Sequence, residues 1–126
     1  MRNRKPTVLV IETDKAVRDM LRRDLSQDFH VLMPGRPSTL LSYTDRVDAI
    51  VVCCKWFGDY NVVELARRMA WSFKGPIIAV TKHHDEMEAA GCNMFCTNFE
   101  LSATLRLALG MPLTSGSILT AALVPA

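Results

Sequence analysis

The sequence predicts an α/β domain with three layers, in which five parallel strands form a sheet that helices cover on both faces. Two observations predict this fold. Short runs of apolar, mostly β-branched residues recur along the chain, and residues 8–11 and 49–53 are the clearest of them. Segments with the apolar spacing of amphipathic helices separate these runs. Continuous apolar strands are typical of parallel sheets buried on both faces, and their alternation with helices implies right-handed crossovers.

Length and composition exclude several classes of protein. The chain has 126 residues, enough for one domain of ordinary size, and 49% of them are apolar, as in a globular protein with a core. A net charge of +2 is too small to indicate nucleic acid or an acidic membrane surface as a partner. No apolar stretch approaches the roughly 20 residues that span a bilayer. The apolar run after the basic N-terminus is too short for a secretory signal, so we expect a cytoplasmic protein.

The first half of the chain contains two expected strands and two expected helices. After the strand at 8–11, Asp14 offers an N-cap. The helix that follows has its apolar residues at helical spacing, and these are Val17, Met20, Leu21 and Leu25. A second strand is expected at 29–33, closed by Pro34 and Gly35, and a weak helix at 37–43, where Pro37 suits a first turn.

The second half repeats the pattern three times. Its elements are expected in the order strand 49–53, loop 54–60, a helix from Val62 to Phe73, strand 76–80, helix 85–90, strand 92–96 and helix 101–109. Gly91 stops the fifth of these segments. Residues 1–6 form a basic N-terminal extension and 7–110 the domain. Residues 111–126 show no clear periodicity, which is typical of a flexible end or a linker.

In these segments the chain resembles the receiver domain of bacterial two-component response regulators. The resemblance implies a sheet of the flavodoxin-like type, in the order 2-1-3-4-5. Receivers hold magnesium with an acidic pair after the first strand, and of Glu12 and Thr13 only Glu12 carries a carboxylate. Receivers place the phosphate-accepting aspartate at the end of the third strand, where this chain has Cys53. The expected phosphoryl acceptor is therefore missing.

Of three further positions in the resemblance, two keep the residue type that receivers use and one departs from it. Thr81 matches the switch hydroxyl and Phe95 the switch aromatic, whereas Asn98 replaces a lysine. Phosphoryl transfer needs charge neutralisation by a metal and a lysine. The residues at the phosphoacceptor site therefore predict a pseudo-receiver that is not phosphorylated. The five degenerate positions of this site are Glu12, Thr13, Cys53, Thr81 and Asn98. We expect no enzyme activity, no metal and no cofactor.

Two alternatives remain open. A thiol- or metal-sensing switch would use Cys53, Cys54 and His83 at the functional edge of the sheet. The simpler expectation is that Cys53, Cys54, Cys92 and Cys96 lie in strands as small buried hydrophobes, because their spacing is not that of a zinc site. The chain is also compatible with the N-terminal regulatory module of a longer transcription regulator.

The expected activity is phosphorylation-independent signalling through protein contacts. The resemblance implies an interaction face over residues 84–110. There Leu107 falls outside the helix face that packs on the sheet, and with Phe99 and Met111 it is the expected exposed cluster. The partner would be a kinase, a regulator, an effector or a second copy, with no nucleic acid and no membrane. Trp56 and Phe57 either cover the vacated pocket or contact a partner.

Overall fold

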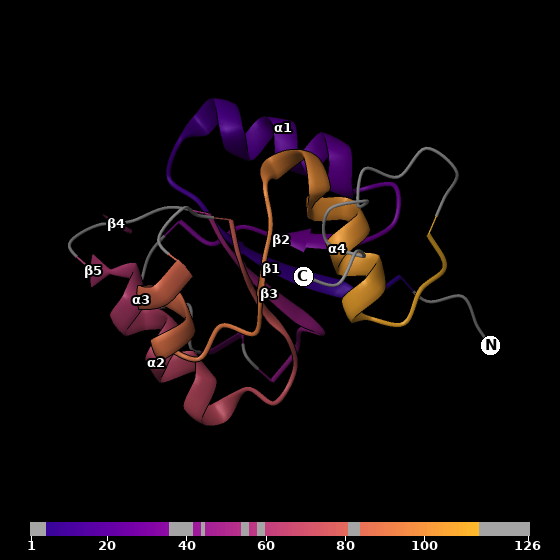
Figure 1. The fold of residues 1–126 in the computed structure, drawn as a ribbon. Helices are drawn as coiled ribbons and strands as arrows, with labels where there is room; N and C mark the ends of the chain where they lie inside the picture. The colour runs from indigo at the N-terminus through magenta and orange to yellow at the C-terminus, as the bar shows by residue number, and fades with distance from the viewer. Residues whose placement is uncertain are drawn as a thin grey trace.

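The computed structural model of the protein describes residues 5–35, 42–43, 45–53, 56–57, 60–80 and 84–113 (Figure 1). Five parallel strands form one sheet in the order β2-β1-β3-β6-β7. The strands are β1 (Thr7–Ile11), β2 (His30–Leu32), β3 (Ala49–Val52), β6 (Ile77–Ala79) and β7 (Met94–Phe95). When only the five strands of this sheet are counted along the chain, their order is 2-1-3-4-5. The predicted fold class and strand order are therefore confirmed.

Helices cover both faces of the sheet. Figure 1 shows α1 (Lys15–Leu25) and α4 (Leu101–Ala108) together on one face, and α2 (Val62–Ser72) and α3 (His84–Ala89) on the other. A short 3-10 helix, Asn98–Glu100, leads into α4. The helix expected at 37–43 lies outside the described residues except for Ser42 and Tyr43, which form part of a 3-10 turn.

Each face of the sheet has its own apolar core. In β3, Ile50 and Val52 face α2 and α3, whereas Ala49 and Val51 face α1 and α4. This alternation follows from the two-residue period of a strand. All four side chains are at most 2% exposed, as the continuous apolar run predicted. The two cores fix the helices against the sheet and so fix the loops at its edges.

Several predicted boundaries are wrong in detail. The loop expected at 54–60 contains a two-stranded antiparallel ladder of β4 (Trp56–Phe57) and β5 (Tyr60–Asn61). Cys53, Cys92 and Cys96 flank strands rather than lying within them, and Cys54 is outside the described residues. The fifth strand, Met94–Phe95, is shorter than expected, and just before it the Asn93 side chain accepts a hydrogen bond from the Ile77 N–H, at 2.6 Å.

No helix in the described ranges is both long and apolar enough to cross a membrane.

Candidate functional site

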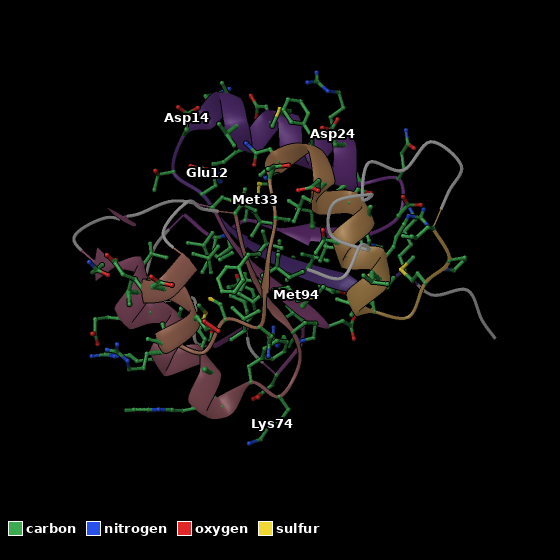
Figure 2. All side chains as sticks on the ribbon, viewed as in Figure 1. Glu12, Asp14, Asp24, Met33, Lys74 and Met94 are labelled. Atoms are coloured by element: carbon green, nitrogen blue, oxygen red, sulfur yellow. The ribbon has the colours of Figure 1, made fainter. Side chains whose placement is uncertain are left out.

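The carboxyl ends of the parallel strands meet at one edge of the sheet, where open α/β sheets bind their ligands. Glu12 follows β1 and Cys53 follows β3 at this edge, and Thr97 and Asn98 come after β7. Parallel topology therefore brings together residues that are far apart in the sequence. Figure 2 labels Glu12 and Asp14 where the chain passes from β1 into α1.

Glu12 is a buried carboxylate, with 7% of its surface exposed. Its Oε2 accepts hydrogen bonds from the backbone N–H groups of Thr13, at 2.8 Å, and Asp14, at 2.9 Å. Bonds from N–H groups to an ionised oxygen are among the stronger hydrogen bonds in proteins. Glu12 therefore holds the turn that leads out of β1, and one of its two oxygens is already engaged in this structural role.

Asp14 caps the helix that follows. Its Oδ1 accepts a hydrogen bond from the Val17 N–H at 3.1 Å, and its carbonyl oxygen accepts from Arg18 N at 2.9 Å. This is the geometry of an N-cap aspartate, and the sequence predicted it. Of the three polar residues after β1, Glu12 and Asp14 are thus both committed to backbone groups of the β1–α1 connection.

Cys53 stands at the carboxyl end of β3. Its backbone N–H donates to the Ile11 carbonyl at 3.0 Å, which extends the pairing of β1 and β3 by one bond. The side chain is half-buried and packs against the core that Val8, Val10 and Val51 share with α1 and α4. Cys53 therefore sits at the edge as a side chain that contacts the apolar core, next to the turn that Glu12 holds.

The residues after β7 are arranged around the start of α4. The Glu100 carboxylate accepts hydrogen bonds from the Thr97 N–H, at 3.2 Å, and the Thr97 hydroxyl, at 3.1 Å. Asn98 is exposed and lines a groove with a volume of about 520 Å³ between α1 and the start of α4. Phe95 is half-buried and packs on the core beneath α2 and α3. Asn98 thus takes part in a surface shared with α1.

Part of the predicted site falls in segments that the structure does not describe. Thr81, Cys54 and His83 lie outside the described residues, as do the side chains of Trp56 and Phe57. Within the described ranges, no three side chains of histidine, cysteine, aspartate or glutamate come together as a metal site would require. The structure therefore brings Glu12 and Cys53 to one edge and leaves the sensing alternative without a described cluster.

The other two described cysteines are buried thiols. Burial raises the pKa of the Cys92 thiol to about 11. Burial also raises the pKa of Cys96 to about 11. Because the thiolate is the reactive form, neither side chain has the chemistry of a sensor at neutral pH. Both behave as the small hydrophobes that the simpler expectation described.

The three residues of the expected interaction cluster do not form one patch. Phe99 is 82% exposed and lies at the groove beside α1, and Leu107 is 41% exposed near the other end of α4. Met111 is half-buried and packs against the core beneath α1 and α4, because its N–H is bonded to the Arg106 carbonyl at 2.7 Å. The exposed members are therefore Phe99 and Leu107.

Sequence reasoning missed two features that the structure makes prominent. Trp71 projects from α2 with 76% of its surface exposed, and its place on the polar side of the predicted helix was the available signal. Arg106 of α4 forms an ion pair with Asp28, before β2, at 2.6 Å. No local sequence pattern predicts this ion pair, because the two residues are brought together only by the packing of α1 and α4.

No protein-family model matches the chain, and no curated protein matches it. Many solved structures do match. The N-terminal domain of the nisin resistance regulator NsrR superposes with a TM-score of 0.71, at 19% identity, over 84% of this chain and 99% of that one. The chemotaxis protein CheY4 of Vibrio cholerae has a TM-score of 0.72, at 17% identity, over 84% of this chain and 100% of that one.

This chain has the receiver-domain fold. A third match, the receiver domain of a sensor histidine kinase from Pseudomonas aeruginosa, has a TM-score of 0.65 at 19% identity and covers 85% of this chain and 99% of that one. That structure is described as holding a magnesium ion in its active-site cleft. In the receiver fold of the present chain, the corresponding edge of the sheet carries Glu12, which is bonded to the backbone, and Cys53.

Proposed function

We propose that this chain is a receiver-type regulatory domain of two-component signalling that acts through protein contacts and is not phosphorylated. The fold it shares with the regulator and chemotaxis domains supports the regulatory role. The observation that carries the proposal is Cys53 at the carboxyl end of β3, half-buried against the core. Acyl phosphate formation needs a carboxylate nucleophile at the reacting position, and a thiol does not supply one.

The geometry of Glu12 supports the same conclusion. Magnesium prefers several oxygen ligands, usually carboxylates together with substrate oxygens. The Glu12 Oε2 atom is bonded to two backbone N–H groups, and Thr13 and Cys53 add no carboxylate. Asn98, which is uncharged, stands where the lysine of the resemblance would neutralise phosphate charge. The domain therefore works by binding rather than by catalysis.

The binding face that fits this role lies along α3, β7 and α4. Leu107 of α4 is an exposed large apolar side chain on this face, and Phe99 lies apart from it at the groove beside α1. An apolar side chain exposed on a rigid helix is suited to a protein contact. The partner is a protein, either a kinase, regulator or effector of the same circuit or a second copy of the chain. The buried thiols Cys92 and Cys96 serve the core in this function.

Incubation with acetyl phosphate and magnesium tests the proposal. Intact-mass spectrometry is expected to show no added mass of about 80 Da, the mass of one phosphoryl group, since the nucleophile is missing. The single variant Cys53→Asp is expected to stay below full reactivity, because Thr13 and Asn98 remain. The triple variant Thr13→Asp, Cys53→Asp, Asn98→Lys is the positive control, in which a carboxylate pair and a cation accompany the nucleophile.

A stoichiometric, hydroxylamine-sensitive adduct on the unmodified chain would contradict the proposal. Hydroxylamine cleaves an acyl phosphate, so its effect also identifies the kind of residue that was modified. Circular dichroism of each variant checks that the fold is retained. A chain that stays unmodified while the triple variant reacts supports the loss of phosphate chemistry at this edge of the sheet.

A further inference from the structure

The outer side of α2 presents an exposed tryptophan among charged residues. Trp71 is 76% exposed, although tryptophan is usually buried to a large extent in folded proteins. It lies three and seven residues after Arg68 and Glu64, so these side chains share the outward side of the helix. The residues of α2 that face the sheet are apolar and buried, so Trp71 takes no part in the core.

Two of the three cations near Trp71, Arg68 and Lys74, have no acidic partner among the described residues. Arg67 pairs with Glu64 on the same helix. Arg68 and Lys74 are exposed and form no ion pair with another described residue. Figure 2 shows Lys74 projecting away from the ribbon at the end of α2. In the sequence Trp71 therefore stands between two cations, Arg68 and Lys74, that form no ion pair within the described part of the chain.

The neighbouring helix carries the opposite charge. In α3, Met87 is buried against the sheet, whereas Asp85, Glu86 and Glu88 are exposed. None of these three carboxylates forms an ion pair with another described residue. Helical spacing places Asp85 and Glu88 on the side away from the sheet, and Glu86 lines a shallow groove shared with α2.

Helices α2 and α3 pack closely against each other and so form one continuous surface. Gly91, which ends α3, has a φ of +104°, and a Cβ at this position would lie 2.6 Å from the Ala70 Cβ. The absence of a side chain at Gly91 thus lets the end of α3 approach α2. As a result, α2, which carries Arg68 and Trp71, and α3, which carries Asp85 and Glu88, lie side by side on the same face of the sheet.

We propose that this α2–α3 face binds the same face of a second copy of the chain. A two-fold interface must be complementary to itself. Here the strip of Arg68, Trp71 and Lys74 on one protomer matches the strip of Asp85 and Glu88 on its partner, twice. A uniformly acidic partner fits less well, because it would be repelled by the α3 carboxylates beside the cations. Trp71 supplies the large apolar contact that interface centres use most often.

Charge reversal with mutual rescue tests this pairing. The basic-strip variant Arg68→Glu, Lys74→Glu sets acids against acids, and the acidic-strip variant Asp85→Lys, Glu88→Lys sets bases against bases. Each variant alone is expected to sediment as a monomer at low salt. An equimolar mixture is expected to form a dimer, because in a mixed pair both copies of the contact regain opposite charges. The unmodified chain is expected to dimerise, and added salt to weaken the dimer.

The control reverses two cations elsewhere. Arg22→Glu, Arg23→Glu changes the net charge by the same amount on α1, at the opposite face of the sheet, and is expected to leave dimerisation unchanged. Trp71→Ala is expected to weaken it by roughly thirty-fold, the effect of truncating a contact of about 2 kcal/mol at an interface centre. Circular dichroism monitors the fold in each case.

Three results would overturn the inference. The first is an unmodified chain that remains monomeric at low salt up to high concentration. The second is a mixture of the two strip variants that fails to associate. The third is self-association that Leu107→Glu abolishes while the basic-strip variant leaves it intact, which would place the second copy on the α4 face of the proposed function. The proposed function itself survives the first two results, because it requires a protein partner and not this particular dimer.

Discussion

Arg106 of α4 joins the two halves of the chain through an ion pair with Asp28, at 2.6 Å. The side chains are 11% and 30% exposed, so water screens this pair less than the pairs on the helix surfaces. A second arm of the guanidinium donates to the Pro112 carbonyl at 2.8 Å. Arg106 therefore joins the end of α4, the turn after α1 and the backbone at Pro112.

Removing this arginine is expected to destabilise the domain. Arg106→Ala loses two charge-assisted hydrogen bonds and leaves the Asp28 carboxylate half-buried without its partner, which costs about 1.5–3 kcal/mol of unfolding free energy. Urea denaturation measures the loss. The matched control is Lys15→Ala, which breaks the exposed Lys15–Asp19 pair of α1 and is expected to cost about 0.5 kcal/mol or less. Equal losses in the two variants would contradict the structural role of Arg106.

Local pattern was enough to predict most of the fold. A parallel strand buried on both faces needs an unbroken apolar run, and Ala49 to Val52 are 2% exposed or less. Asp14 caps α1 because its short carboxylate reaches the N–H of Val17. Each of these features depends on neighbours in the sequence, so the residues themselves carry the information.

Features that depend on tertiary packing could not be predicted. The ion pair of Arg106 and Asp28 joins residues far apart in the sequence. Met111 was expected to be exposed, yet it packs against the core because the chain turns back after Gly110, whose φ is +71°. In the site, the type of residue at position 53 was informative by itself. The engagement of Glu12 with two backbone N–H groups depends on the conformation of the turn after β1.

Gly91 is expected to tolerate no side chain. In Gly91→Ala the new Cβ would meet the Ala70 Cβ at 2.6 Å, and overpacking of this kind costs about 1–3 kcal/mol. The positive φ adds about 1–2 kcal/mol for an L-residue. Thermal or urea unfolding measures the combined cost of the close contact and the positive φ. Gly110→Ala measures the cost of a positive φ alone, because φ at Gly110 is also positive but nothing lies within 4 Å of a Cβ added there.

A double-variant cycle identifies the contact directly. Ala70→Gly removes the atom that the new Cβ would meet, so the pair Ala70→Gly, Gly91→Ala is expected to be less destabilised than the sum of the single variants. Simple additivity would mean that Ala70 is not the neighbour that excludes a side chain at position 91, and that α2 and α3 approach each other less closely than the structure indicates.

The buried thiols are expected to make stability fall at alkaline pH. Cys92 and Cys96 have pKa values raised from 9.0 to about 11. Between these values the unfolded chain releases the two protons and the folded chain keeps them. Unfolding is then favoured as pH rises. The contribution of the two protonated thiols to the free energy of unfolding is therefore fully present below pH 9 and decreases toward pH 11. Urea titrations at a series of alkaline pH values measure the decrease.

The variant Cys92→Ala, Cys96→Ala isolates this effect from the titration of other groups. Loss of two buried side chains lowers its stability at every pH, but the decrease between pH 9 and pH 11 is expected to be smaller than in the unmodified chain. An unchanged slope would show that these thiols do not account for the alkaline loss.

The last prediction concerns the face of α4. Leu107 is 41% exposed, whereas Leu105, two residues earlier, is completely buried in the core. Leu107→Glu is therefore expected to leave the fold unchanged by circular dichroism and to weaken binding of a protein partner, by about 2 kcal/mol if Leu107 lies at the centre of the contact. Binding is measured by titrating a candidate kinase, regulator or effector against both proteins. The control is Leu113→Glu, which changes an apolar residue of similar exposure beyond the helix and is expected to bind as the unmodified chain does. If Leu107→Glu binds every such candidate as tightly as the unmodified chain, while at least one of them binds, the α4 face is not the functional surface.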